Sequence, residues 1–316
     1  MKNIFFTLTL FLLVATNIAI SGNWVYEGKW GSYGTGDGQF RYPTGIVIAN
    51  NGYIYVADEL NNRIQYFSLT GTFIGKWGSY GNGDGQFYHP MGIGVAPNNN
   101  IYVPDTVNHR VQYFTPDGQF LGKWGSSGSG DGQFWQPYAI DVADNGTVYV
   151  ADQDNNRIQY FTSTGTFLGK WGSRGSGDGQ LYIPHGVEVA PNGNVYVSDS
   201  GNDRVCYFSP NGTFLGKWGS LGSGDGQFNN PRNIFIKDNI VYVADCDNHR
   251  FQYFTLDGKF LGKWFSLDLD QPYDIAISPN GKLYLSDWFN YCIHYFRYAP
   301  DIITPASLGI VKALFK

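Results

Sequence analysis

The stretch PYAIDVADNGTVYVADQDNNRIQYFTSTGTFLGKW, residues 137–171, decides the fold of this chain. It contains four short segments that are rich in β-branched and aromatic residues, and such segments are typical of strands. The segments cover residues 137–142, 148–152, 157–161 and 166–171. Asn-Gly at residues 145–146 favours the tight turn of a β-hairpin. The stretch therefore predicts one four-stranded antiparallel meander.

The same unit recurs along the chain, and its last three residues, Gly-Lys-Trp, mark the period. The repeated tryptophans are Trp30, Trp77, Trp124, Trp171, Trp218 and Trp264. Successive tryptophans are 47 residues apart, except for the last two, which are 46 apart. A single meander cannot bury both of its faces. Repeating it around an axis solves this problem, so the period predicts a β-propeller.

The two ends of the chain predict how the ring closes. The sixth copy supplies three strands, near residues 273–277, 282–287 and 291–296, and its fourth strand is missing. Residues 23–30 match a fourth strand that stands alone before the first copy. We therefore expect an all-β fold: a six-bladed β-propeller of four-stranded antiparallel blades. In this fold the N-terminal strand completes the last blade, which leaves no open sheet edge.

Residues 1–21 have the order of a secretory signal peptide, with Lys2, an apolar run over residues 4–14, and then small and polar residues. The apolar run is short for a membrane span. We expect a signal peptide over 1–21, the propeller over 22–297, and a C-terminal tail over 298–316 that either caps the ring as a short helix or stays loose. The protein is then secreted, extracellular or periplasmic. It meets a membrane only if the signal segment is uncleaved.

Composition argues against nucleic acid as a partner. The formal net charge is −5 and only 15% of residues are charged, whereas nucleic-acid binding needs clustered Lys and Arg. We expect a monomer.

Three cysteines, Cys206, Cys246 and Cys292, are too few for a disulfide framework. Two alternatives stay open: one disulfide with one free thiol, or three buried thiols. Asn145 and Asn211 lie in glycosylation sequons, and the turns they form explain both residues equally well.

Two parts of the copies resemble the NHL repeat, which is named after Asn-His-Leu: the segment that follows the second strand, and the run that leads into the innermost strand. DTVNHRVQYF at 105–114, DCDNHRF at 245–251 and FYHPMGIGV at 87–95 carry the resemblance. It extends over essentially all of residues 23–296, in six registered copies, and it implies a six-bladed propeller. It implies less about activity. NHL propellers are known as protein- and RNA-binding modules, as extracellular sensor domains and as a zinc-dependent peptide-amidating lyase.

Residues that recur in every copy are expected to be scaffold. In register along the chain, an acid opens the loop after the second strand and an arginine closes it. The acids are Asp58, Asp105, Asp152, Asp199, Asp245 and Asp287, and the arginines are Arg63, Arg110, Arg157, Arg204 and Arg250. Such pairs suit a local hydrogen-bonded clamp. Cys292 replaces the arginine in the sixth copy, so we expect a weaker clamp where the ring closes.

Function is sought where the copies disagree, which is around the proline that begins each innermost strand. The long polar connections lie at one end of the ring, the long-loop face, and the innermost strands enter from it. The variable residues should therefore surround the mouth of the central channel. The predicted ligand-binding residues are Tyr88, His89, Met91, Trp135, Tyr138, His185, Arg232 and Tyr273. Aromatic rings with interspersed Arg and His suit stacking on sugars or gripping peptide side chains. For each single aromatic residue, packing between blades is an equal alternative.

We therefore expect an exported, non-catalytic binding or scaffold propeller that recognises a protein, peptide or glycan ligand on its long-loop face. We predict no catalytic residue, no metal and no cofactor. The alternative, implied by the resemblance to the lyase, is a metal-dependent lyase or hydrolase at the mouth of the central channel. That site would need about three histidines around the channel. Of the five histidines, His185 and, less clearly, His89 are suitably placed.

Overall fold

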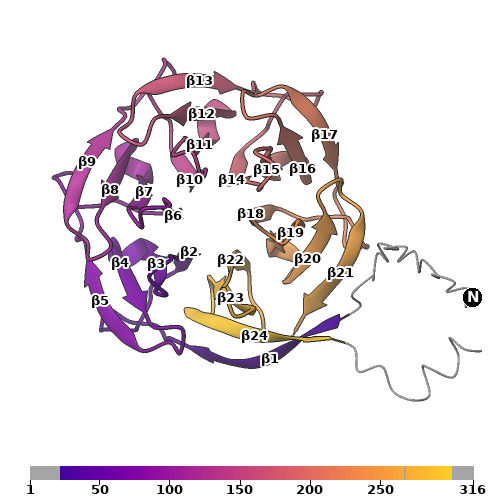
Figure 1. Cartoon of the computed structure of the whole chain (residues 1–316), viewed down its shortest axis with the longest axis horizontal. Coiled ribbons are helices and arrows are strands. Elements are labelled where there is room, and N and C mark those ends of the chain that lie inside the picture. Colours follow the sequence, from indigo (N-terminus) through magenta and orange to yellow (C-terminus); the bar gives the residue numbers. More distant parts are fainter. Residues whose placement is uncertain (1–21, 267, 301–316) are drawn as a thin grey trace, which may run out of the picture. The chain divides into compact units, whose positions relative to one another are not determined.

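Each copy of the repeat folds into a four-stranded antiparallel sheet, and the sheets stand as blades around a central axis (Figure 1). The computed structural model describes residues 22–266 and 268–300, in six such sheets. The predicted signal segment and tail residues 301–316 lie outside the described residues. Contacts group residues 26–297, which form the ring, into one compact unit. The predicted fold class is confirmed.

The blades follow the order of the chain, from the innermost to the outermost strand. Blade 1 is β2 (Pro43–Ile48), β3 (Ile54–Asp58), β4 (Arg63–Phe67) and β5 (Phe73–Trp77). Blade 2 is β6 (Gly94–Val95), β7 (Ile101–Asp105), β8 (Arg110–Phe114) and β9 (Phe120–Trp124). Blade 3 is β10 (Pro137–Val142), β11 (Val148–Asp152), β12 (Arg157–Phe161) and β13 (Phe167–Trp171). Blade 4 is β14 (Pro184–Val189), β15 (Val195–Asp199), β16 (Arg204–Phe208) and β17 (Phe214–Trp218). Blade 5 is β18 (Pro231–Lys237), β19 (Ile240–Asp245), β20 (Arg250–Thr255) and β21 (Phe260–Phe265).

Blade 6 is completed by the start of the chain, as the sequence predicts. Its sheet has the order β22 (Pro272–Ile277), β23 (Lys282–Asp287), β24 (Cys292–Pro300) and β1 (Gly22–Trp30). Glu27 on β1 forms ion pairs with Lys282 at 2.8 Å and with Arg297 at 3.5 Å. The N-terminal strand therefore closes the ring and is held to blade 6 by charge as well as by the sheet.

Short 3-10 helices occupy the loop between the second and third strands of blades 1 to 5. They are η1 (Glu59–Asn61), η2 (Thr106–Asn108), η3 (Gln153–Asn155), η4 (Ser200–Asn202) and η5 (Cys246–Asn248). No helix in the described part of the chain is long and apolar enough to cross a membrane.

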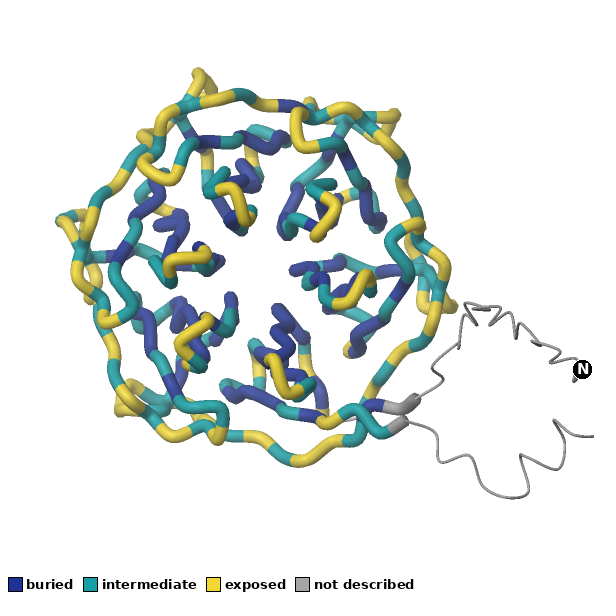
Figure 2. Tube along the Cα trace, in the orientation of Figure 1, coloured by how far each residue is buried: buried dark blue, intermediate teal, exposed yellow. Residues whose placement is uncertain are grey.

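The Gly-Lys-Trp tryptophans link each blade to the next one. The ring centroid of Trp77 on β5 lies 5.7 Å from that of Phe114 on β8, and Trp30 on β1 makes the same contact with Phe67 on β4 at 4.3 Å. A Cβ atom on Gly118, in the hairpin turn of blade 2, would lie 2.7 Å from the Trp77 ring, so only glycine fits there. Buried residues follow the inner strands, and exposed residues gather on the outermost strands and turns (Figure 2). The repeated tryptophans thus serve packing between blades.

The acid–arginine pairs tie the long loops to the blades. In blade 3, Arg157 Nε donates to Asp152 Oδ2 at 2.7 Å. Its two Nη atoms donate to the carbonyl oxygens of Ser129, Gly130 and Gln133 at 2.7 to 2.9 Å. Blades 1, 2, 4 and 5 repeat this arrangement with their own arginines. One guanidinium group therefore neutralises a fully buried carboxylate and fixes the loop that enters the blade.

The loop residue just before each of these arginines links neighbouring blades. Asn156 Oδ1 accepts a hydrogen bond from the backbone N–H of Ile183 at 3.0 Å, and His109 Nδ1 accepts one from Gln136 at 3.1 Å. His249 makes the equivalent contact with Gln271 at 3.4 Å. The histidines of the Asn-His-Arg segments therefore form structural hydrogen bonds to the backbone of the next blade.

The clamp yields a prediction for stability. Arg157→Lys keeps the positive charge but cannot supply the forked donors, so it leaves the loop carbonyls and part of Asp152 unpaired. We expect a loss of about 3 kcal/mol of unfolding free energy, measured by urea and thermal unfolding. Lys170→Ala is the matched control, because its ion pair with Asp131 in the same part of the ring is exposed; it should change stability by less than about 1 kcal/mol. Equal effects of the two variants would contradict the role of the clamp.

Candidate ligand-binding site at the channel mouth

A β-bulge at the start of each innermost strand sets the side chains at the channel mouth. In blade 3, Pro137 pairs with Asp152 and Ile140 pairs with Val150, so the inner strand has one extra residue. Bulges re-aim side chains locally. The residue directly after the proline is placed by this bulge in each blade: Thr44, Met91, Tyr138, His185, Arg232 and Tyr273.

Five of the predicted binding residues form one packed group, which we call the channel plug: Met91, Tyr138, His185, Arg232 and Tyr273. Arg232 Nη1 donates to Tyr138 Oη at 3.0 Å and lies 3.1 Å from Nε2 of His185. Its guanidinium carbon is 5.5 Å from the centroid of the Tyr273 ring. The rings of Tyr138 and His185 stack at 4.4 Å, and Tyr273 Oη lies 3.6 Å from Met91 Sδ. These side chains therefore hold one another in place, although the buried Nε of Arg232 has no hydrogen-bond partner among the described residues.

The plug disfavours a cation at this position. Burial, and then the neighbouring charge of Arg232, lower the pKa of His185 well below its usual value of 6.5. The imidazole is therefore neutral at pH 7, but its ring nitrogens already face a guanidinium group. A metal ion bound there would sit beside a fixed positive charge.

The other three predicted residues lie outside the plug. Trp135 is 48% exposed and its ring lies 5.8 Å from that of His109. Tyr88 packs edge-on against Tyr80 at 5.2 Å. His89 Nδ1 lies 2.8 Å from Glu59 Oε1. The structure thus divides the predicted set into the plug, in which Tyr138, His185 and Tyr273 are buried, and a periphery that ends in the exposed Trp135.

The sequence analysis missed a second ring of variable residues, which directly follow the loop-opening acids. They are Glu59, Thr106, Gln153, Ser200, Cys246 and Trp288. Glu59 is buried, and besides His89 its carboxylate binds Trp288, whose Nε1 donates to Oε2 at 3.1 Å. The six copies differ at this position, directly after an acid that all of them share, and this variation could have identified the ring from the sequence.

Aromatic residues gather on the long-loop face where blade 6 meets blade 1. We call this group the seam cluster: Tyr33, Tyr42, Trp288, Phe289 and Tyr291. The Tyr42 ring lies 5.0 Å from Trp288, 5.8 Å from Phe289 and 5.2 Å from Tyr291, and Tyr33 packs on Tyr291 at 4.9 Å. Tyr33 is 57% exposed and Phe289 is 39% exposed. The cluster therefore presents aromatic surface to solvent.

The seam cluster continues to the channel mouth. Trp288 lies 6.1 Å from Tyr273 of the plug, ring to ring, and it also donates to Glu59. The equivalent positions of the other blades carry no such aromatic group: Trp288 and Phe289 correspond to Gln153 and Asp154 in blade 3. An aromatic pair at these two loop positions is thus particular to blade 6, while exposed aromatic residues elsewhere on the face, such as Tyr80 and Trp135, occupy other positions.

Farther along the innermost strands, a cavity of about 170 Å³ contains three carboxylates, those of Asp141, Glu188 and Asp274. Each accepts a backbone hydrogen bond from the following blade. The bonds run from Val189 N to Asp141 Oδ2 at 2.8 Å, from Ile46 N to Asp274 Oδ2 at 2.8 Å and from Ile236 N to Glu188 Oε1 at 3.2 Å. The acids therefore satisfy N–H groups on the inner edges of the blades.

The channel carboxylates hold their protons more tightly than free acids do. Burial raises the pKa of Asp141 to about 6 and that of Asp274 to about 7. Burial, and then the charge of Asp141, raise the pKa of Glu188 well above 4.5. Between the ordinary pKa of an aspartate, 3.8, and the raised values of about 6 and about 7, the folded state binds more protons than the unfolded state. These groups therefore make the protein less stable as the pH rises through that range.

All three cysteines are buried free thiols in the structure. Among residues 22–266 and 268–300, one group of three metal-ligating side chains has its donor atoms within 4.8 Å of one another: Asp287, Cys292 and His294, in the interior of blade 6. This group lies within a blade and belongs neither to the channel plug nor to the seam cluster.

Comparisons with known proteins agree with the fold. Residues 40–67 and 87–114 match the NHL repeat, and residues 178–294 match a family described as a 6-bladed beta-propeller. The B-box type zinc finger protein ncl-1 of Caenorhabditis elegans is 43% identical over 49 residues, which are 16% of this chain and 6% of that protein. The E3 ubiquitin-protein ligase TRIM71 of Gallus gallus is 49% identical over 45 residues, 14% of this chain and 5% of the ligase. The chain thus spans a small part of these relatives.

Solved structures extend the similarity over most of the chain. A streptogramin B lyase has a TM-score of 0.62 at 13% identity, with 89% of this chain and 99% of the lyase covered. A gluconolactonase of Xanthomonas campestris has a TM-score of 0.64 at 13% identity, with 88% and 98% covered. Identity at this level shows a shared fold.

The channel acids yield a pH-dependent prediction. Glu188→Gln keeps the carbonyl oxygen that accepts from Ile236 but cannot ionise, so it removes the cost of a buried charge. The variant should gain stability over the wild type, by a small amount at pH 5 and by about 1 to 3 kcal/mol at pH 8, where the wild-type acid is more ionised. Urea unfolding at both pH values measures this. An equal difference between variant and wild type at the two pH values would contradict the raised pKa.

Proposed function

Starting from a six-bladed β-propeller that contains NHL repeats, we propose that this protein is a non-catalytic binding module. Its long-loop face recognises a protein, peptide or glycan ligand. The observation that carries this proposal is the seam cluster, an exposed aromatic surface beside the fixed carboxylate of Glu59.

The chemistry of the seam cluster suits recognition. Aromatic rings offer a large apolar face and lose little side-chain entropy when a ligand packs on them. The Glu59 carboxylate is held by two donors, His89 Nδ1 and Trp288 Nε1, which fix its position near the rings. A sugar ring or an apolar peptide side chain fits such a platform.

The contacts of the channel plug favour a binding role over metal-dependent catalysis at the mouth of the central channel. A metal-dependent lyase or hydrolase needs several free ligands and an open coordination position. His185 instead contacts the guanidinium group of Arg232, and His89 is paired with Glu59. Export is part of the proposal and is supported by the signal-like order of residues 1–21. The ligand is then met outside the cytoplasm, and the channel mouth acts as the inner border of the binding face.

The proposal predicts that exposed rings of the seam cluster carry affinity. The purified full-length chain is first applied to glycan and peptide arrays, and the affinity of each bound probe is then measured for the wild type and for Tyr33→Ala combined with Phe289→Ala. Both rings are exposed, so the fold should be unchanged. Loss of two contact rings should weaken binding at least about tenfold.

Leu168→Ala is the matched control, because Leu168 is 48% exposed on the outermost strand of blade 3, away from the seam. It should leave the affinity unchanged. Unchanged affinity in the double variant would contradict the seam cluster as the binding surface. Loss of affinity in Trp135→Ala alone would place the ligand on the blade 3 side of the face instead.

A further inference from the structure

Blade 6 departs from the other blades at its clamp. In blades 1 to 5 the carboxylate that ends the second strand binds an arginine Nε at 2.6 to 2.7 Å. In blade 6 the arginine position carries Cys292, and the next inward-facing position, which is glutamine in blades 1, 2, 3 and 5, carries His294. The loop that enters the blade is also shorter, since 8 positions separate Trp264 from Pro272 whereas 13 separate Trp124 from Pro137. The loop that supplies the carbonyl acceptors of the arginine in the other blades is therefore five positions shorter in blade 6.

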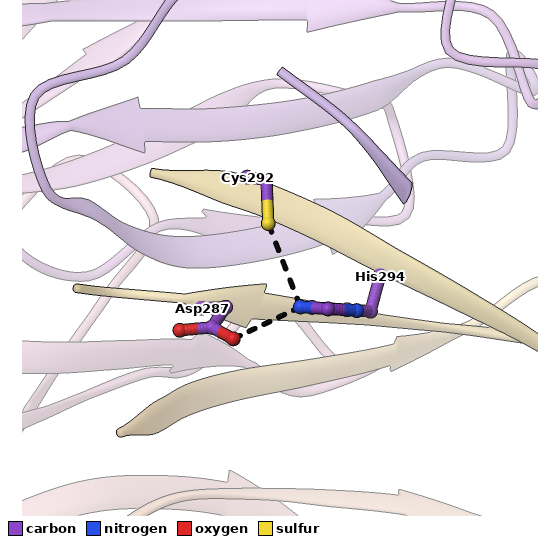
Figure 3. Close-up of side chains that lie close together, drawn as sticks. All are labelled: Asp287, Cys292 and His294. Atoms are coloured by element: carbon purple, nitrogen blue, oxygen red, sulfur yellow. Dashed lines mark hydrogen bonds and ion pairs between the residues drawn. The ribbon is translucent and has the colours of Figure 1, made fainter. Parts of the chain in front are cut away.

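The replacement residues converge on one point (Figure 3). Asp287 ends β23, and Cys292 and His294 lie on the neighbouring strand β24. His294 Nε2 is 2.9 Å from Asp287 Oδ2 and 3.5 Å from Cys292 Sγ, and all three side chains are buried. Both contacts involve the same ring nitrogen. A proton relay from thiol to carboxylate would use both imidazole nitrogens, so this arrangement is not a nucleophilic triad.

We propose that Asp287, Cys292 and His294 form a zinc site. Thiolate sulfur, imidazole nitrogen and carboxylate oxygen are the donors that Zn²⁺ prefers. Tetrahedral zinc with ordinary bond lengths separates a sulfur and a nitrogen ligand by about 3.5 Å, which is the distance observed between Sγ and Nε2. The donor atoms of the three residues all lie within 4.8 Å of one another, and Asp287 Oδ2, which also accepts from Asn290 Nδ2 at 2.8 Å, is 2.9 Å from Nε2. Binding of one ion therefore requires Asp287 to move away from the imidazole nitrogen.

The site also balances charge in the way that the clamp does elsewhere. In the other blades the arginine cation neutralises the buried aspartate. In blade 6 the two charges of Zn²⁺ are balanced by the carboxylate of Asp287 and the thiolate of Cys292. Binding releases the thiol proton to solvent, and the imidazole proton moves from Nε2 to Nδ1, so that Nε2 can donate its lone pair.

A cavity with room for a fourth ligand borders His294, although neither Asp287 nor Cys292 lines it. His294 lines a cavity of about 60 Å³ together with Ser266 and Asp268, on the shortened loop. This volume is enough for a water molecule. Three protein ligands and one water complete the coordination of zinc.

Metal uptake by the purified full-length chain tests the proposal. The chain is stripped with a chelator and then titrated with Zn²⁺, and separately with Co²⁺. One ion should bind per chain, and the cobalt form should show a thiolate-to-cobalt charge-transfer band in its absorption spectrum. Zinc should also raise the melting temperature. Cys292→Ser and His294→Gln should each lose stoichiometric binding.

The combined variant Cys206→Ser and Cys246→Ser is the control, because it leaves Cys292 as the only thiol and all three ligands in place. It should bind one ion and keep the cobalt band. This variant decides the question even where Cys292→Ser or His294→Gln weakens the fold. Absence of stoichiometric uptake by the wild type, or loss of the band in the control, would overturn the proposal.

Discussion

Every blade buries one carboxylate at the end of its second strand, and an ionised group in such a place costs several kcal/mol unless it is paired. In five blades the partner is an arginine, and its remaining donors reach the carbonyl groups of the loop that enters the blade. One charge thus organises both the interior of the blade and its connection to the previous blade. This pairing fixes the long loops of five blades, and blade 6, which carries Trp288, Phe289 and Tyr291 of the seam cluster, lacks it.

The fold could be predicted because its signals are local and repeated. Turn chemistry and strand patterning within residues 137–171 define one blade, and a fixed period multiplies it. The structure gives β10, β11 and β12 the same bounds as the sequence pattern, and β13 begins one residue later. The closing blade could be predicted in the same way, because the lone N-terminal strand matches the fourth strand of the repeat.

The site could be predicted only in part, because its contacts join distant parts of the chain. Arg232 and Tyr138 are 94 residues apart, and Trp288 and Glu59 are 229 apart. Register placed Tyr138, His185, Arg232 and Tyr273 around the channel, but it could not show that the guanidinium group would bind the other three. Glu59 and Trp288 were missed because the search for variable residues was centred on the proline of each innermost strand and not on the position after the loop-opening acid. Their proximity arises when the ring closes.

The closing seam is where the symmetry of the repeat ends, and the two unusual features of the protein meet there. Residues 288–291, which carry most of the seam cluster, form the turn between Asp287 and Cys292. In the other blades this loop is held by an arginine, and in blade 6 it has the hydrogen bonds of Asp287 with Asn290 and His294. A zinc ion bound by Asp287 and Cys292 would fix both ends of the turn at once. Fixing a loop before binding reduces the entropy that a ligand must overcome. The metal site and the aromatic surface are then two parts of one arrangement, in which the interior of blade 6 holds in place the rings that it presents to solvent.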